Sequence, residues 1–210
     1  MIILDLETSG TDWRYHSILS IGAIDFDNPE NEFYGECTAF EGAKIEPEAL
    51  AINGFTVEEI TPGEKGFTLI DGSKPKMSDK ELILKFMEWA KRVGDTTIGG
   101  ENPSFDRDFL KATAERYSID WTFAYRTIDL HSVAYAHMLS KGIEPPSKNN
   151  HSGLNLPKII AYCGLPENKQ AHNALEDTLF TAEAFGRIVY GQNTVSDFEA
   201  YPIPPHLNRS

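Results

Sequence analysis

Three segments that lie far apart in the sequence carry acidic side chains suited to binding metal ions. Asp5 and Glu7 are two residues apart in the apolar run 1–7, and alternate residues of a β-strand project from the same face. Two carboxylates about 4 Å apart repel each other by roughly 4 kcal/mol at an effective dielectric constant of 20. The pair therefore requires a cation if the strand is buried, whereas two solvated acids are expected if the strand lies at an exposed edge.

The second and third segments add two more acids and a histidine. Asp106 lies near the start of an expected helix at 104–117, which places the carboxylate beside the end of the sheet. Taken alone, Asp106 also fits a first-turn acid that is favoured by the helix dipole. His172 precedes the last expected helix, and Asp177 lies in the first turns of that helix.

Together, four carboxylates and one histidine match the requirements of two-metal phosphodiester hydrolysis. In that chemistry, two divalent ions about 3.5–4 Å apart hold the attacking and leaving oxygens. Mg²⁺ and Mn²⁺ suit such oxygen ligands. A histidine can accept the proton of a metal-bound water near neutral pH. The sequence therefore predicts two Mg²⁺ or Mn²⁺ ions and a phosphodiesterase reaction.

These residues belong to three motifs whose order is that of a known family. The motifs are Asp-Leu-Glu-Thr-Ser-Gly at 5–10, Asn-Pro-Ser-Phe-Asp at 102–106 and His-Asn-Ala-Leu-Glu-Asp at 172–177. In these motifs the chain resembles the DEDDh branch of the DnaQ-like 3′–5′ exonucleases, which have a ribonuclease H-like fold. Further agreement at 20–23, 52–56 and 127–130 extends the resemblance over about residues 1–190.

The resemblance implies a role for each of the five residues. Asp5, Glu7 and Asp177 would hold the metal ion that activates water. Asp5 and Asp106 would hold the ion at the leaving oxygen, with Asp106 binding directly or through a water molecule. His172 would be the general base. The implied reaction is hydrolysis at the 3′ end of single-stranded DNA or RNA, with release of nucleoside 5′-monophosphates.

The resemblance also implies a pocket for the terminal nucleotide. The residues expected around it are Thr8, Ser9, Gly10, Asn102 and Phe105. Glu101 departs from the family pattern, because many relatives have histidine at this position. The departure concerns local substrate contacts and leaves the expected metal ligands unchanged.

The charge of the chain restricts how a nucleic acid is held. With 19 Lys and Arg against 32 Asp and Glu, the formal net charge is −13, whereas binding to phosphate backbones relies on basic side chains. The expected substrates are therefore single-stranded 3′ ends or short oligonucleotides. Cleavage is expected to be distributive unless a polymerase or another protein partner provides additional binding to the nucleic acid. Candidate local cations are Lys65, Lys74, Lys76, Lys141 and Lys148, in the expected loops 61–78 and 141–153.

Other features of the composition predict a cytoplasmic protein without membrane contact. No run of about 18 apolar residues is present, and the first residues lack the pattern of a signal peptide. Cys37 and Cys163 are too few for a disulfide framework and have no CxxC spacing. We expect both to be buried thiols in a reducing compartment.

The segments between the motifs predict the fold that positions them. Strands are expected at 1–7, 17–26 and 31–40 with a turn at 27–30, followed by strands at 96–100 and 122–128; helices are expected at 80–94, 104–117, 129–140 and 174–190, with another from Asn155. Ser104 and Asp129 are expected N-caps. The predicted fold class is α/β, a ribonuclease H-like three-layer fold. Its mixed five-stranded sheet has three antiparallel strands followed by parallel strands, with helices on both faces.

The domain prediction is an exonuclease domain at 1–190 and a C-terminal tail at 191–210. The tail contains several prolines and is expected to be extended on the surface or disordered.

Two other classes of function fit the same fold. A catalytically silent module that binds or scaffolds proteins usually lacks a metal ligand, whereas all five residues are present here. A metal phosphoesterase on the same sheet would act on free nucleotides or small phosphodiesters. Product analysis on a labelled oligonucleotide distinguishes this enzyme from an exonuclease.

Overall fold

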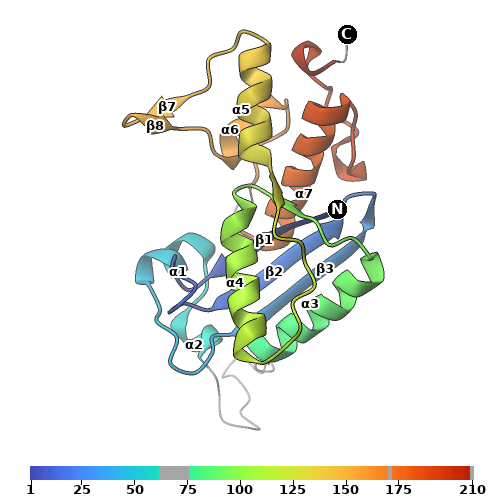
Figure 1. Cartoon of the computed structure of the whole chain (residues 1–210). Helices are drawn as coiled ribbons and strands as arrows, with labels where there is room; N and C mark the ends of the chain where they lie inside the picture. Colours follow the sequence, from blue (N-terminus) through green and yellow to red (C-terminus); the bar gives the residue numbers. More distant parts are fainter. Residues whose placement is uncertain (62–75, 170–171, 209–210) are drawn as a thin grey trace.

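A mixed six-stranded sheet forms the centre of the fold (Figure 1). The computed structural model describes residues 1–61, 76–169 and 172–208. The strands, in chain order, are β1 (Ile2–Thr8), β2 (Ile18–Asp25), β3 (Asn28–Thr38), β4 (Met77–Ser78), β5 (Ile98–Gly100) and β6 (Thr127–Asp129). Their spatial order is β4-β3-β2-β1-β5-β6.

The strand directions confirm the predicted mixed sheet. β1, β2 and β3 pair antiparallel, and β5 and β6 run parallel to β1. The predicted number of five strands is wrong, because β4 also pairs with β3. A strand of two residues is too short to show the alternation that identifies a strand in the sequence. A turn does join β2 and β3, but it lies at 26–27 and not at 27–30, since β3 already begins at Asn28.

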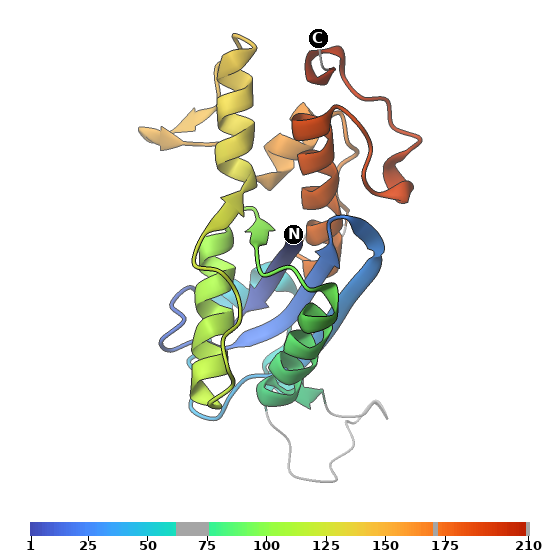
Figure 2. The ribbon, with the colours of Figure 1, turned by 45° about the vertical axis from the view of Figure 1, so that its right-hand side comes forward.

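Both faces of the sheet are covered by helices, as predicted (Figures 1 and 2). The helices are α1 (Pro47–Asn53), α2 (Val57–Ile60), α3 (Asp79–Val93), α4 (Pro103–Arg116), α5 (Leu130–Ser140), α6 (Leu156–Tyr162) and α7 (Ala174–Phe185). Leu4 and Leu6 of β1 pack with α3 and α4 on one face. Ile3 packs with α5, α6 and α7 on the other.

The N-termini of α4 and α5 can be compared with the two predicted N-caps. Asp129 accepts hydrogen bonds from the backbone N–H groups of His131 and Ser132 and is the N-cap of α5, as predicted. The prediction of Ser104 as N-cap of α4 is wrong. Asn102 occupies that position with a left-handed backbone (φ 57°), and Pro103 follows as the first helical residue.

The expected loop 141–153 contains a small hairpin. β7 (Ser147–Lys148) pairs antiparallel with β8 (His151–Ser152). Asn149 and Asn150 form the turn with φ values of 49° and 64°, which asparagine adopts more readily than most residues. In both ribbon views the hairpin projects on the same side of the molecule as the chain that follows β1 (Figures 1 and 2). Residues 62–75 of the other expected loop, with Lys65 and Lys74, lie outside the described residues.

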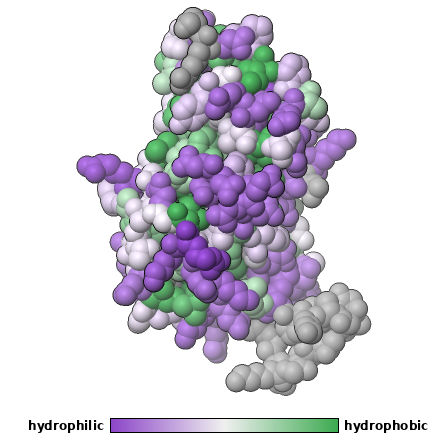
Figure 3. Space-filling view, turned by 90° about the vertical axis from the view of Figure 1, so that its right-hand side faces the viewer, coloured by the Kyte–Doolittle hydropathy of each residue, from purple (hydrophilic) through white to green (hydrophobic). Residues whose placement is uncertain are grey.

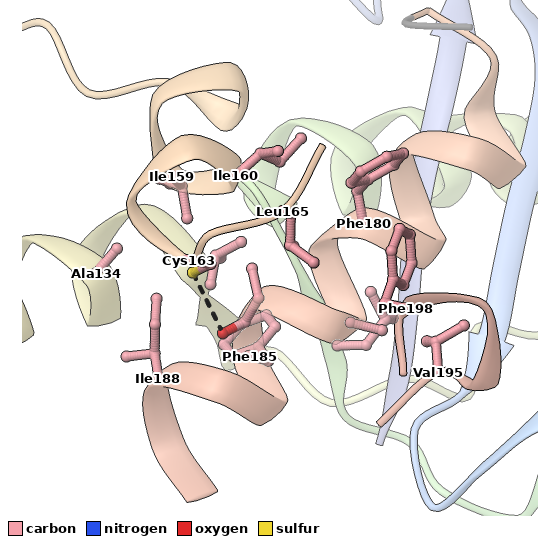
Figure 4. Packing of buried hydrophobic residues seen from close by; sticks show 14 of the residues in the cluster. Ala134, Ile159, Ile160, Cys163, Leu165, Phe180, Phe185, Ile188, Val195 and Phe198 are labelled. Atoms are coloured by element: carbon pink, nitrogen blue, oxygen red, sulfur yellow. Dashed lines mark hydrogen bonds between the residues drawn. The ribbon is translucent and has the colours of Figure 1, made fainter. Parts of the chain in front are cut away.

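The C-terminal segment is packed, so the prediction of an extended or disordered tail is wrong for 191–208. Val195 and Phe198 lie against Phe180 and Phe185 of α7 (Figure 4), and Leu207 is also buried. The guanidinium group of Arg187 donates hydrogen bonds to the carbonyl oxygens of residues 163, 198, 201 and 202. These hydrogen bonds hold the C-terminal segment against the turn that directly follows α7.

The surface seen in Figure 3 is largely polar, with hydrophobic residues in small separate groups. Across the described residues, none of the helices is long and apolar enough to span a membrane. Cys37 and Cys163 are both buried, as predicted, and neither forms a disulfide.

Candidate active site

The first two acidic residues lie on the central strand of the fold. β1 pairs with β2 along its length and with β5 at Ile2 and Ile3, so it is not an edge strand; Glu7 is buried and Asp5 is half-buried. Asp5 is paired with Gly22 and Glu7 with Ser20 in the neighbouring β2. Both carboxylates project toward the face that is covered by α7, because they alternate with the residues that face α3 and α4.

The close approach of α4 places Asp106 at the same end of β1. A Cβ on Gly100, just before this helix, would lie only 2.8 Å from the carbonyl oxygen of Leu4. Glycine therefore allows the chain to cross β1 closely before the helix begins at Pro103. Asp106 is 3% exposed and accepts a hydrogen bond from the backbone N–H of Leu6.

The N-terminus of α7 brings His172 and Asp177 to the site. The Asn173 side chain caps the helix by accepting hydrogen bonds from the N–H groups of Leu175 and Glu176. His172 has a left-handed backbone (φ 69°), and its N–H donates to the Asp177 carboxylate over 2.9 Å. The second oxygen of Asp177 accepts a bond of 2.7 Å from the Asn168 side chain.

Three side chains converge closely enough to share one metal ion. One ligand atom from each of Glu7, His172 and Asp177 lies within 4.8 Å of the other two. The predicted residues of the first and third motifs are therefore together in the fold, with the His172 ring exposed and the two carboxylates buried.

The pKa shifts show that the four carboxylates lie close enough to influence one another. Burial raises the pKa of Asp5 well above its usual value, and the charges of Asp106, Glu7 and Asp177 add to the effect. Burial and the same neighbouring acids raise the pKa of Glu7 to about 8. Burial likewise raises the pKa of Asp106 to about 8, although backbone N–H bonds oppose the shift. Such a buried acidic cluster fits divalent cations, which bind deprotonated oxygen ligands and supply the missing positive charge.

The sequence that forms this site matches the model of a known protein family. Residues 2–185 match the family model described as "Exonuclease" (RNase_T). The chain belongs to this exonuclease family. The predicted membership of the DnaQ-like 3′–5′ exonucleases is thereby confirmed.

Relatives of similar length support the assignment of this exonuclease. Ribonuclease T of Shewanella baltica is 28% identical over 210 residues, which cover 90% of this chain and 80% of the relative. Ribonuclease T of Yersinia pestis is 26% identical over 216 residues, which cover 97% of this chain and 89% of the relative.

Solved structures show the same fold at lower identity. The E. coli exonuclease I complex with single-stranded DNA has a TM-score of 0.63 and 19% identity, over 86% of this chain and 38% of the exonuclease I chain. The exonuclease described here thus matches well under half the length of that enzyme. Cell-death related nuclease 4 has a TM-score of 0.67 and 16% identity, over 92% of this chain and 64% of the nuclease.

The residues predicted to surround the substrate differ in exposure and in whether their side chains already make hydrogen bonds inside the protein. The Ser9 hydroxyl donates to the carbonyl oxygen of Lys44 and accepts the N–H of Ser17, so it is used inside the protein. The Thr8 hydroxyl donates to the carbonyl oxygen of Gly10 and shapes the turn. Asn102 is exposed at the start of α4. The half-buried Phe105 ring packs on Phe109, with 4.8 Å between ring centroids.

Two asparagines at the site were not identified from the sequence. Asn168 orients Asp177, as described above, and no pattern in the sequence marks it. The Asn53 side chain donates to the carbonyl oxygen of Thr8 over 3.1 Å and forms a hydrogen bond with Glu7 that lowers the pKa of this acid. Asn53 lies in the segment 52–56 that supported the family resemblance, which was the available signal.

We expect Gly22→Ala to reduce kcat/KM for nucleotide release about 100-fold, the order of loss that a 1 Å displacement can cause. A Cβ at Gly22 of β2 would lie 2.2 Å from the carbonyl carbon of Ala174, so the start of α7, which carries the site residues, would have to move away from the sheet. The matched control is Gly35→Ala, whose Cβ would clash with the end of the Leu82 side chain and not with backbone atoms. Comparable kcat/KM values for the two folded variants would contradict the prediction.

Proposed function

We propose that this protein is a DEDDh-type, metal-dependent 3′–5′ exonuclease that releases nucleoside 5′-monophosphates from single-stranded DNA or RNA. The observation that carries the proposal is the convergence of Glu7, His172 and Asp177 near the half-buried Asp5 and the buried Asp106, whose charge raises the pKa of both Asp5 and Glu7. Membership of the exonuclease family supports the reaction class.

The side chains divide into metal ligands and a proton acceptor. Asp5, Glu7 and Asp177 would hold one Mg²⁺ or Mn²⁺ ion, and Asp5 with Asp106 a second. Bound divalent ions supply activation of water and stabilisation of charge on the attacking and leaving oxygens. His172 is the proposed general base, because its exposed ring lies beside Glu7 and Asp177. The hydrogen bonds from Asn168 and the His172 backbone fix the orientation of the Asp177 carboxylate.

The charge distribution favours short, single-stranded substrates. Lys76 is not a free cation, since its Nζ lies 2.7 Å from the Glu36 carboxylate. Lys141 and Lys148 are exposed, and Lys148 is part of the hairpin that projects on the same side as the end of β1 (Figure 1). Because the chain has a net charge of −13, we propose that the enzyme binds mainly the terminal nucleotide and acts distributively.

The direct test uses 5′-labelled single-stranded DNA and RNA of one sequence, with Mg²⁺, Mn²⁺ or EDTA. We expect a ladder of products shortened from the 3′ end, which requires metal and is lost in His172→Ala. The control is His151→Ala, which removes another exposed imidazole and should leave the ladder intact. A folded protein that produces no ladder from either polymer with metal present would refute the proposal.

The pKa shifts predict that stability depends on pH and metal together. The carboxyls of Glu7 and Asp106 have pKa values raised from 4.5 and 3.8 to about 8, so the unfolded chain loses these protons at lower pH than the folded protein does. The metal-free protein should therefore lose stability as pH rises from about 4 to about 8. Metal binding needs the deprotonated carboxylates. We accordingly expect the Tm increase on addition of Mg²⁺ or Mn²⁺ to be larger at pH 8 than at pH 6.

Thermal melts in EDTA and in metal measure this difference. The variant Glu7→Gln should have a metal-free Tm at pH 8 at least about 3 °C above wild type, which corresponds to roughly 1 kcal/mol in a domain of this size. It should also show a smaller shift with metal. Equal metal shifts at both pH values in the wild-type protein would contradict the prediction.

A further inference from the structure

A polar pocket of about 200 Å³ is lined in part by the proposed metal ligand Glu7. Its lining includes Glu7, Ser20, Glu36, Asn53, Lys76 and His172. This volume is far larger than the roughly 10–15 Å³ that one water molecule needs. Two of these residues also belong to the proposed catalytic centre, so the pocket and the centre are continuous.

The floor of the pocket is a row of three side chains across the sheet. Glu7 of β1 is paired with Ser20 of β2, and Ser20 is paired with Glu36 of β3. Ser20 is 1% exposed, yet its hydroxyl oxygen has no hydrogen-bond partner among the described residues. A buried hydroxyl without a partner is unfavourable, and here it lines a pocket that is large enough for a ligand.

The surrounding groups favour a hydroxyl-bearing ligand over an anion. The Glu36 carboxylate is held by Lys76, 2.7 Å away, and by the Tyr34 hydroxyl, which donates to it over 2.5 Å. The ammonium group of Lys76 also lies 4.1 Å from the centre of the Phe55 ring. Among the described residues that line the pocket, the acids Glu7, Glu36 and Glu59 outnumber the one Lys or Arg, so these groups disfavour a further anion. A sugar hydroxyl can donate to a carboxylate and accept from Ser20.

The position of the pocket identifies which sugar it would meet. Glu7 would hold a metal ion at the scissile phosphate, and Asn53 connects Glu7 to the carbonyl oxygen of Thr8. The pocket therefore begins where the terminal nucleotide is proposed to lie. The ribose of that nucleotide is attached to the scissile phosphate, so its hydroxyl groups are the first available to enter.

We propose that this pocket binds the 2′-hydroxyl of the 3′-terminal nucleotide, with Ser20 and Glu36 as hydrogen-bond partners, and selects a terminal ribonucleotide. The inference rests on the proposed function and names its preferred substrate. A terminal deoxyribose leaves the Ser20 hydroxyl without a partner, which is a source of discrimination.

The test uses two DNA oligonucleotides of identical sequence that differ only in a 3′-terminal ribose or deoxyribose. We expect wild type to release the ribonucleotide with about five- to ten-fold higher kcat/KM, the effect of one neutral hydrogen bond. Ser20→Ala should lower the value for the ribose end and leave the deoxyribose end unchanged, so the ratio between the two ends falls toward the part that Glu36 supplies. Thr113→Val removes another buried hydroxyl outside the pocket and should preserve the wild-type ratio.

The possible outcomes separate the two proposals. Equal wild-type rates on both ends, or a Ser20→Ala variant that keeps the wild-type ratio, would overturn the 2′-hydroxyl assignment and leave the exonuclease proposal standing. Absence of release from either oligonucleotide by folded wild-type protein with metal would overturn the exonuclease proposal itself. Thermal melts of Ser20→Ala establish that it is folded, and a reduced ribose preference in the folded variant supports the assignment.

Discussion

Asp5→Asn is expected to reduce the single-turnover rate of 3′-nucleotide release at least about 1000-fold, because metal ions contribute several kcal/mol to stabilising the transition state. Asp5 is the proposed ligand of both ions. The substitution keeps the shape of the side chain but removes one of the charges that hold the cations. It also removes a negative charge that partial burial and the neighbouring carboxylates disfavour. The metal-free variant should therefore be at least as stable as wild type at pH 8.

This combination of effects distinguishes a metal ligand from a structural residue. The measurements are the rate of nucleotide release and the Tm shift on addition of Mg²⁺ or Mn²⁺, and both should collapse together. Asp25→Asn is the matched control, because Asp25 lies at the opposite end of the same strand pair, across from Ile2. It should retain wild-type rate and metal shift. A folded Asp5→Asn protein with a rate within ten-fold of wild type would refute the role of Asp5.

Arg187→Met is expected to lower the free energy of unfolding by about 3–5 kcal/mol, the cost of removing one partner of a buried ion pair. Arg187 and Glu183 are both 0% exposed, and their charged groups lie 2.6 Å apart. Glu183 also accepts hydrogen bonds from the backbone N–H groups of Thr194 and Val195. Loss of the guanidinium group leaves a buried carboxylate without its cation and several backbone carbonyl groups without their donor.

Urea denaturation of the two proteins measures this cost. Arg92→Met is the matched control, since Arg92 also pairs with an acid four residues away, Glu88, but both side chains are exposed. Its loss should stay within about 0.5 kcal/mol. A loss below about 1 kcal/mol in Arg187→Met would show that the pair does not anchor the C-terminal segment. Limited proteolysis would report the same anchoring, with earlier cleavage after residue 190 expected in the variant.

Local residue patterns were sufficient for most of the secondary structure around the site. The apolar run around Asp5 and Glu7 predicted a strand, and alternation placed both acids on one face. Asp129 and Asn155 were recognisable as helix starts because capping is a short-range interaction between a side chain and nearby backbone N–H groups. The spacing of the three motifs also predicted which acids would meet, through their resemblance to a known family.

Local residue patterns did not predict which distant segments of the chain pair with one another. The central position of β1 depends on β5, almost 100 residues away, and the environment of Asp5 and Glu7 depends on α7, which packs on their face of the sheet. The packing of 191–208 depends on the Arg187–Glu183 pair, whose i, i+4 spacing looks like that of an ordinary exposed pair. Ser20, Glu36 and Lys76 form a pocket only because β1, β2 and β3 are in one register. The chemistry of each side chain is local, whereas burial, pKa and partners arise from contacts that the fold makes between remote parts of the chain.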